Sequence, residues 1–291
     1  MGDNVKLIQW FPGHMAKARR EITESLKKVD VIFELRDARI PISSKNPMID
    51  EIINNKPRVV LFNKANIADK AVTKAWMDYY KKQNIVCLDI DSIDGYNISK
   101  IINSAQYALK DELLRREKRG IKSKTIKAMI LGIPNVGKST LINKLAKRKA
   151  VGVGDKPGVT KNQTWIKVSD DLFLLDTPGI LWPKFEDQMV GVKLAMCGSI
   201  KDEILNLDDL TLKAIEYLME YYPTNLMKRY NLDKLEDTPL KILDQICLKR
   251  GFLIKGGNYD YQRCVTMFIN DLRNVRIGSM SYERPEGYWF I

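Results

Sequence analysis

One short stretch, "GIPNVGKST" at residues 132–140, constrains the fold of this 291-residue chain more than any other. It matches the pattern GxxxxGK[S/T], in which glycines let backbone N–H groups converge on phosphates. The apolar, strand-like "AMIL" precedes it and the helix-like "TLINKLAKR" follows it. A glycine-rich turn that merely fits the pattern is the alternative, and the flanking strand and helix argue against it. The sequence therefore predicts a phosphate-binding loop between a strand and a helix.

Each side chain of this loop has an expected task. Lys138 places a positive charge against the outer phosphates of a nucleotide, and the Ser139 hydroxyl faces Mg²⁺. The residues expected to bind nucleotide through this loop are Asn135, Val136, Gly137, Lys138, Ser139 and Thr140.

Two later segments are typical of a switch around a triphosphate. "DLFLLDTPG" at residues 171–179 reads as a buried strand that ends in Asp176, where water-mediated Mg²⁺ binding is needed, and the Gly179 N–H can sense a γ-phosphate. Alone, DTPG would be an ordinary turn. Upstream, "DKPGVTKNQ" offers Thr160, whose hydroxyl and carbonyl would close on Mg²⁺, although a plain loop threonine is the alternative. We therefore expect Mg²⁺ to be held by Ser139, by Thr160 and, through water, by Asp176.

The segment "LFNKANIAD" at residues 61–69 has the pattern of a purine-reading loop after a strand. Asn63 is expected to tie loops together, and the Lys64 stem to cover the face of the ring. This loop and a second base loop after the next strand both precede the phosphate loop in the chain. Their order in the sequence does not prevent them from meeting at one site, because ligands of a doubly wound sheet bind outside the carboxyl ends of its strands. The residues expected at the base are Asn63, Lys64 and Asn66 in this loop and Asp91 and Ser92 after the next strand.

Strand-like and helix-like runs alternate through the first two thirds of the chain, which predicts an α/β fold with a mainly parallel sheet flanked by helices. Helical patterns alone follow after about residue 197, so a separate all-helical domain is expected. The expected strands are "VIFELR", "RVVLF", "IVCLDI", "KAMILG", "QTWIKV" and "DLFLLD". The helices expected among them cover residues 15–28, 70–83, 97–119 and 138–148.

The formal net charge of +12 favours a polyanionic partner. Residues 241–276 hold seven basic and three acidic side chains, so an RNA-binding face is possible there, with a solvated helix surface as the alternative. No apolar run is long enough to span a membrane and the N-terminal stretch lacks the apolar core of a signal peptide, so we expect a cytoplasmic protein without a membrane partner. The four scattered cysteines are expected to be buried thiols.

Together with "QWFPGHMAKA", "DARIP", "NPMID", "GVT" and "LLDTPGILWPKFED", the rotated loop order resembles the circularly permuted ribosome-assembly GTPases of the bacterial RbgA (YlqF) family. The resemblance implies a circularly permuted P-loop GTPase domain over residues 1–196, followed by a small helical RNA-binding domain over 197–291. It implies GTP and GDP as ligands and slow hydrolysis that the ribosome stimulates. It further implies a factor for late maturation of the large ribosomal subunit. Because the helical domain follows the DTPG switch in the chain, we expect the nucleotide state to control binding and release of rRNA, and we expect a monomer off the ribosome.

Three positions carry further expectations. The family's base loop ends in Asp, and Asn66 replaces it here, so GTP binding is weakened unless a neighbour such as Asp69 repairs it; an amide would instead suit xanthine. His14 is the only histidine, and the resemblance makes it the candidate for positioning the attacking water, against a structural role. Asn135 matches the loop Asn that helps hold K⁺ in related GTPases.

Two other functions are compatible with the same sequence. One alternative is a purine-nucleotide-dependent RNA-binding switch of relaxed base specificity that acts on another RNA. Another is an RNA-binding protein with a decayed nucleotide site, against which the intact Lys138 and Asp176 argue. The residues expected to contact RNA are Lys241, Lys249, Arg250, Lys255, Arg263, Arg273 and Arg276.

Overall fold

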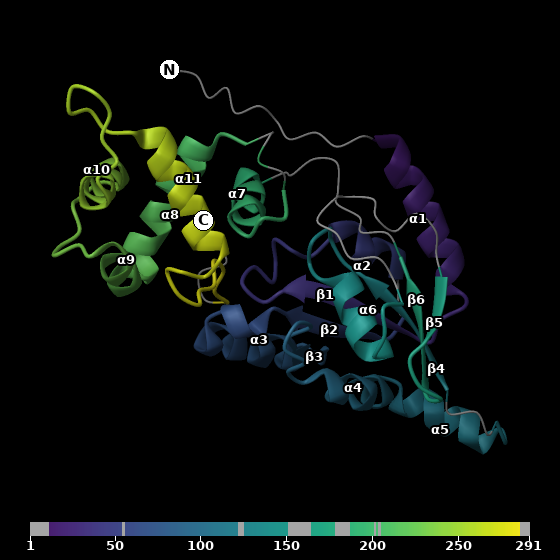
Figure 1. Ribbon diagram of the computed structural model, residues 1–291. Helices are drawn as coiled ribbons and strands as arrows, with labels where there is room; N and C mark the ends of the chain where they lie inside the picture. The colour runs from purple at the N-terminus through teal and green to yellow at the C-terminus, as the bar shows by residue number, and fades with distance from the viewer. Residues whose placement is uncertain are drawn as a thin grey trace. The chain divides into compact units, whose positions relative to one another are not determined.

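The computed structural model describes residues 12–53, 56–121, 125–150, 164–177, 187–200, 202 and 205–285, with side chains described from residue 19 onward. The chain forms two compact units (Figure 1). A sheet unit comprises residues 1–186 and 283–291, and a helical unit comprises residues 187–282. The expected domain boundary lay between residues 196 and 197, whereas the units divide between 186 and 187 because helix α7 contacts α8 and α11.

The sheet unit is built on a six-stranded sheet with the strand order β3-β2-β1-β4-β6-β5. All neighbouring strands run parallel except β5, which is antiparallel to β6. The strands are β1 (Val31–Asp37), β2 (Arg58–Asn63), β3 (Val86–Asp89), β4 (Ile126–Leu131), β5 (Thr164–Lys167) and β6 (Leu172–Asp176). Each expected strand is present, and the mainly parallel α/β sheet is confirmed.

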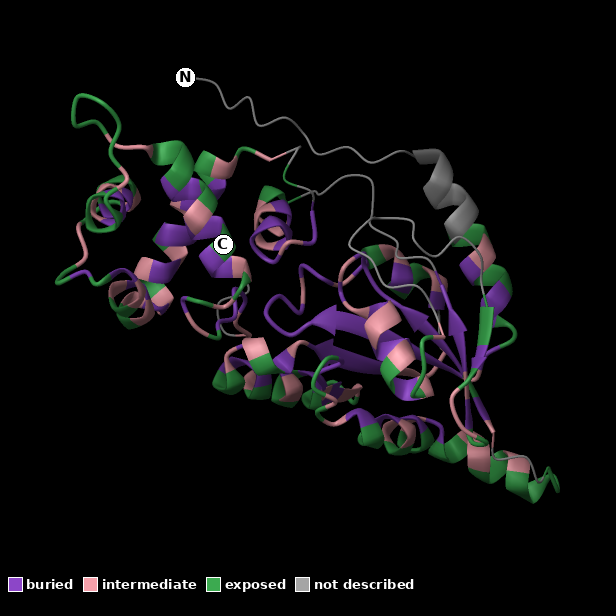
Figure 2. Ribbon diagram, in the orientation of Figure 1, coloured by how far each residue is buried: buried purple, intermediate pink, exposed green. Residues whose placement is uncertain are grey.

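The neighbouring strands β1 and β2 are buried on both faces of the sheet (Figure 2). Successive side chains of a strand point to opposite faces, yet Ile32 and Phe33 of β1 are both fully buried. Continuous apolar runs are what a parallel sheet with helices on both faces requires. This explains why "VIFELR" and "RVVLF" lack the alternation of a strand with one wet face.

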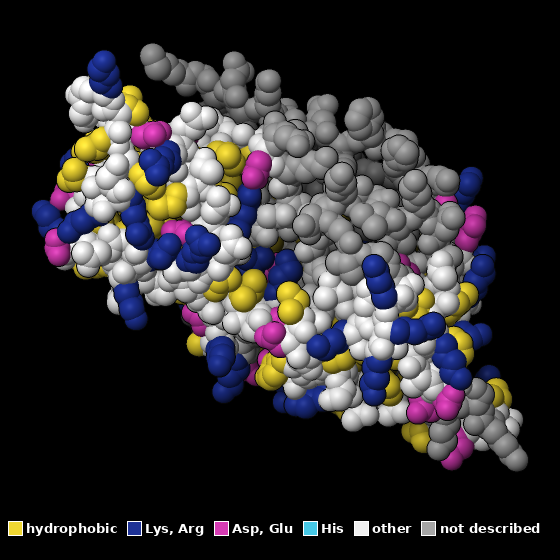
Figure 3. Space-filling view, viewed as in Figure 1, with side chains coloured by type: hydrophobic (Ala, Val, Ile, Leu, Met, Phe, Trp, Pro, Cys, Tyr) yellow, Lys and Arg dark blue, Asp and Glu magenta, His cyan; other side chains and the backbone are white. Residues whose placement is uncertain are grey.

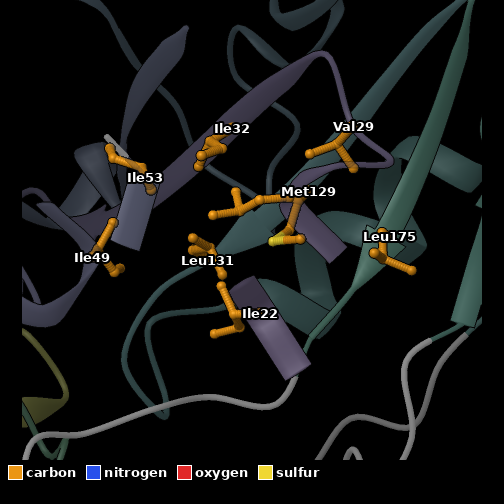
Figure 4. Close-up of a cluster of buried hydrophobic side chains, with 9 residues drawn as sticks. Ile22, Val29, Ile32, Ile49, Ile53, Met129, Leu131 and Leu175 are labelled. Atoms are coloured by element: carbon orange, nitrogen blue, oxygen red, sulfur yellow. The ribbon is translucent and has the colours of Figure 1, made fainter. Parts of the chain in front are cut away.

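Helices cover the sheet through apolar side chains spaced along one side of each helix. α1 and α2 place Ile22 and Ile49 against Ile32 of β1, Met129 of β4 and Leu175 of β6 (Figure 4). α3 places Trp76 against β2 in a second cluster. The helices of this unit are α1 (Pro12–Leu26), α2 (Pro47–Ile53), α3 (Lys70–Lys82), α4 (Ile101–Ala108), α5 (Lys110–Lys118) and α6 (Lys138–Ala146).

Two details of these helices differ from the sequence expectations. The single helix expected over residues 97–119 is divided at Leu109, whose φ of −101° and ψ of 6° leave the helical region. α2, which falls on "NPMID", was not expected, because seven residues are too few to show a helical period.

The helical unit contains α7 (Gln188–Met196), α8 (Leu207–Tyr221), α9 (Pro223–Tyr230), α10 (Pro239–Arg250) and α11 (Tyr261–Arg273). Its core includes Ile215, Ile246 and Phe268, which are fully buried. Fully buried Asp271 of α11 accepts two hydrogen bonds from Arg229, at 2.9 and 3.0 Å, which join α11 to α9. The three cysteines of this unit are buried, whereas Cys87 of the sheet unit is half-buried.

Candidate nucleotide site

The phosphate loop joins the end of β4 to the start of α6, which begins at Lys138. Its tight course requires glycine at residue 137, where φ is +100°. A Cβ atom there would lie 2.3 Å from Nδ2 of Asn63. The close approach shows that the loop is shaped against the base loop from far upstream in the chain.

Lys138 is buried at the N-terminus of α6, with 8% of its surface exposed. Its Nζ donates hydrogen bonds to the carbonyl oxygens of Gly132 at 3.0 Å and Ile133 at 2.8 Å. Burial lowers the pKa of Lys138 to about 8, and the negative charge of Asp176 opposes the shift. An anion at this position would stabilise the charged ammonium, so the site is prepared for phosphate.

Asn63, at the end of β2, connects the base loops to the phosphate loop. Its Nδ2 donates to the carbonyl oxygen of Val136 at 2.8 Å. Its Oδ1 accepts from the backbone N–H of Ser92 at 3.0 Å and from the Ser92 hydroxyl at 2.6 Å. Because Asn63 and Ser92 are 1% and 3% exposed, these bonds form a buried junction. The tie between loops that the sequence predicted for Asn63 is present in the structure.

Lys64 follows in the left-handed region, with φ at +63°. Its Nζ donates to the carbonyl oxygen of Asn135 at 3.0 Å and pairs with Asp37 at 2.9 Å. Burial would raise the pKa of Asp37, but the charges of Arg39 and Lys64 outweigh it and hold that pKa well below its usual range. Sequence reasoning gave Asp37 no role, although it begins the quoted "DARIP" segment at the carboxyl end of β1.

The base loops place two more side chains beside each other. Nδ2 of Asn66 donates a hydrogen bond to Oδ2 of Asp94 at 2.8 Å, and both residues are exposed. Asp69, the neighbour that the sequence suggested as a replacement carboxylate, caps α3 by accepting from the N–H groups of Ala71 and Val72. Asp94 is a carboxylate that reaches Asn66, and a separation of 28 residues in the sequence concealed it.

A cavity of about 270 Å³ lies between the phosphate loop and the base loops. Its lining comes from Asn63, Lys64, Asp91, Ser92, Ile93, Asn135, Gly137, Lys138, Ser139 and Thr140. Nine of these ten residues were expected at the nucleotide, and Ile93 was not. Asp91 orients its loop, because its Oδ1 accepts from the N–H groups of Ile93 and Asp94, each at 2.8 Å.

Other expected site residues lie elsewhere or outside the described part of the chain. Thr160 and Gly179 are not among the described residues, and of His14 only the backbone, within α1, is described. Asp176 ends β6 with 1% of its surface exposed, near enough to Lys138 to affect its charge. Ser139 and Asp176 supply the hydroxyl and carboxylate that Mg²⁺ prefers beside phosphates. Among described residues, no group of three His, Cys, Asp or Glu is arranged to hold a metal without phosphate.

Six of the seven basic residues expected at RNA are exposed, and Figure 3 shows Lys and Arg side chains spread over the visible surface. Arg273 is different. Its side chain is 19% exposed, pairs with Asp202 at 2.7 Å and donates to the carbonyl oxygen of Ala195 at 2.8 Å. It therefore anchors α11 within the helical unit. Arg263 lies over the ring of Phe252, at 4.5 Å from its centroid.

Comparisons with known proteins identify the family. Residues 127–242 match the family described as 50S ribosome-binding GTPase. A Bacillus licheniformis protein named ribosome biogenesis GTPase A is 50% identical over 96% of this chain and 99% of its own length. A Thermotoga maritima protein of the same name is 30% identical over 96% of this chain and 95% of its own. The chain belongs to the ribosome biogenesis GTPase A family.

Solved structures from this family agree with the fold. A GDP-bound YlqF structure has a TM-score of 0.65 at 26% identity and covers 92% of this chain and 100% of its own. A GNP-bound YlqF from T. maritima has a TM-score of 0.64 at 27% identity, covering 93% and 99%. As a member of the GTPase A family, the chain is a GTPase that binds GTP and GDP on a circularly permuted fold. The alternative of a purine switch of relaxed base specificity is not favoured.

Proposed function

We propose that this protein is a GTP-hydrolysing factor for late maturation of the large ribosomal subunit, and that its nucleotide state controls rRNA binding and release. The observation that carries the proposal is the set of hydrogen bonds through Asn63, which joins the base loops to the phosphate loop around one cavity. These loops occur along the chain in the rotated order of the GTPase A family. Its relatives are named for ribosome biogenesis. Its partners are the large-subunit precursor and its rRNA.

The site is proposed to use two cations. Ser139 and, through water, Asp176 would hold Mg²⁺, together with Thr160 when a triphosphate is bound. Mg²⁺ supplies charge that neutralises the β- and γ-phosphate oxygens. Asn135, which lines the cavity, holds K⁺ near the same phosphates. Replacing K⁺ by Na⁺ at constant ionic strength is expected to lower hydrolysis while leaving GDP affinity unchanged; equal rates in the two salts would remove K⁺ from the proposal.

His14 is proposed to position the attacking water, because Ile180, after DTPG, is aliphatic and cannot do so. Hydrolysis is then slow off the ribosome and faster on it, where the partner completes the positioning. His14→Ala is expected to lower ribosome-stimulated hydrolysis at least tenfold with little change in GTP affinity. An equal loss of affinity would instead assign His14 a structural role.

The helical region from residue 197 onward is proposed as the rRNA-binding module. Exposed Lys255 and Arg263 are suited to contact the phosphate backbone. Arg273 is left out of this set because its guanidinium holds Asp202 and Ala195. Arg263→Glu is expected to weaken RNA binding and to reduce its salt dependence, whereas Lys234→Glu, a matched charge reversal on the same unit, leaves both nearly unchanged.

One experiment tests the central claim. Purified protein is sedimented with large-subunit precursors in the presence of GDP or a non-hydrolysable GTP analogue, at several salt concentrations. The proposal expects tighter binding with the analogue and release with GDP. Equal binding in the two states would contradict nucleotide control. The same gradients report whether the protein is monomeric off the ribosome, as we propose. Fractionation of a cell lysate tests the cytoplasmic location that we also propose. No helix in the described residues is long and apolar enough to cross a membrane.

A further inference from the structure

The carboxyl end of β1 carries a charged cluster between the two halves of the nucleotide site. β1 lies between β2, which leads into the base loop, and β4, which leads into the phosphate loop. In the register of the sheet Asp37 is opposite Asn63, which brings it beside the next residue of the base loop, Lys64. The stem of Lys64 is the group expected to cover the face of the base. Asp37 is therefore placed to act on the nucleotide through Lys64.

The Lys64 side chain reaches from the base loop to the phosphate loop. Its Nζ donates to the carbonyl oxygen of Asn135 at 3.0 Å and lies 2.9 Å from Oδ2 of Asp37. Lys64 and Asn135 both line the cavity of the candidate nucleotide site. The Lys64 side chain, which is 22% exposed, is thus anchored at its ammonium end beside that cavity.

Asp37 is held in one orientation by its own neighbours. Its carboxylate, whose side chain is 1% exposed, accepts from Nε of Arg39 at 2.9 Å and from Nη2 of Arg39 at 2.8 Å. Its backbone N–H donates to the Ser44 hydroxyl at 3.0 Å. A two-point guanidinium–carboxylate pair adds geometric specificity to the charge. The carboxylate therefore offers the Lys64 ammonium an acceptor in a fixed position.

The charges of this cluster suit a site for an anion. One carboxylate faces two cations, so Asp37, Arg39 and Lys64 together keep one positive charge. Burial opposes the charged carboxylate, but the two cations outweigh it and hold the pKa of Asp37 well below its usual range. Fixing a lysine side chain costs rotamer entropy, and a side chain already fixed by folding removes that cost from binding. The cluster therefore prepares Lys64 for a ligand without adding net negative charge.

We propose that Asp37 is a positioning residue for the base of the nucleotide. It holds the Lys64 ammonium against the phosphate loop, so that the Lys64 stem is already in place to cover the purine ring. Asp37 acts only through Lys64, and Arg39 orients Asp37. The inference rests on nucleotide binding in this cavity, and it gives a task to the "DARIP" segment that Asp37 begins.

This role makes an effect of Asp37 depend on the base of the ligand. The stem of Lys64 is expected to cover the ring and not the phosphates. Loss of Asp37 should therefore weaken ligands that carry a base and spare inorganic tripolyphosphate, which offers the phosphate loop its ligand without a base. A structural role for Asp37 would weaken both kinds of ligand together, because the phosphate loop would lose its shape as well.

The test is equilibrium affinity for GTP, GDP and tripolyphosphate in wild type, Asp37→Asn, Lys64→Met and the double variant. Asp37→Asn is expected to weaken GTP and GDP about tenfold, and to change tripolyphosphate affinity by about twofold or less. Lys64→Met keeps an unbranched stem without the anchored ammonium and should weaken the nucleotides by a similar factor. In the Lys64→Met background, Asp37→Asn should weaken them no further, because the two residues act as one unit.

Asp30→Asn is the matched control at the opposite end of β1. Asp30 pairs with Arg116 and accepts from the backbone N–H of Lys127 at 2.8 Å. The exchange makes the same change of charge, so it should lower the Tm and leave the affinities for all three ligands unchanged. Asp37→Asn should also lower the Tm, because Arg39 loses a buried partner. Affinities are therefore compared at a temperature at which every variant is folded.

Three results would overturn the inference. In the first, Asp37→Asn weakens tripolyphosphate as much as it weakens GTP. In the second, the losses of GTP affinity from Asp37→Asn and Lys64→Met add in the double variant. In the third, Lys64→Met retains wild-type affinity for GTP, and this result decides even where Asp37→Asn does not fold. A wild type that binds tripolyphosphate but neither GTP nor GDP would overturn the nucleotide site and the inference together, and this outcome is read without any variant.

Discussion

The phosphate end and the base end of the nucleotide site are built differently. The phosphate end comes from one run of residues, 132–140, between β4 and α6. The base end joins residues 63–66 to residues 91–94, and hydrogen bonds through Asn63 hold the two together. A contiguous loop carries its chemistry in its own sequence, whereas an assembled one depends on partners that only folding brings together. Substitutions at the two ends should therefore fail in different ways.

The largest effect is expected from Lys138→Ala, at the phosphate end. It removes the buried cation of the phosphate loop, so GTP affinity should fall on the order of a hundredfold, about 3 kcal/mol. Stability at pH 7 should not fall, because burial disfavours the charged ammonium in the free protein. Nucleotide titration and thermal unfolding measure the two quantities. Parallel losses of affinity and stability would mean that the lysine serves the fold.

Asn63→Ala, at the junction of the two ends, should have the next largest effect. It removes the bond to Val136 and leaves the buried N–H of Ser92 without its acceptor. We expect GTP affinity to fall by roughly ten- to thirtyfold, with loss of the preference for GTP over ATP, since each such bond contributes about 1 kcal/mol and an unsatisfied buried donor costs more. Retained selectivity would show that the base end holds its shape without the phosphate loop.

The pH dependence of GTP binding should distinguish the phosphate end from the base end without a large structural change. The pKa of Lys138 in the free protein is lowered to about 8, and phosphate binding favours the charged form. As the pH rises through this value the free site loses its positive charge, so GTP affinity should fall about tenfold between pH 7 and pH 9. Lys138→Arg stays charged and should show a flatter profile. An unchanged slope in that variant would assign the titration to another group.

The smallest effect is expected from Lys144→Met. Lys144 of α6 is exposed and makes one hydrogen bond to the carbonyl oxygen of Ile93, a second tie between the ends. Exposed contacts of this kind contribute little, so GTP affinity should change by about twofold or less. A larger loss, measured in the same titration, would show that the exposed tie contributes as much as the buried one at Asn63.

Sequence reasoning succeeded where structure is local and failed where it depends on distant contacts. Strands such as β1 and β2 were expected because buried parallel strands are continuous apolar runs. The short helices α2 and α7 were missed, since seven or nine residues carry too little periodicity. Asp94 was missed because 28 residues separate it from Asn66, and Asp69, close in sequence, was considered in its place.

The sequence by itself determined the phosphate loop, the strand pattern and the rotated order of the motifs, because each of these lies within a short run of residues. Only the tertiary structure decided which side chains meet. In the folded chain Asp37 forms an ion pair with Lys64, Asp69 caps α3, and Asp94 accepts a hydrogen bond from Asn66. The physical reason is that parallel strands gather their carboxyl ends at one edge of the sheet, so residues far apart in the chain become neighbours there.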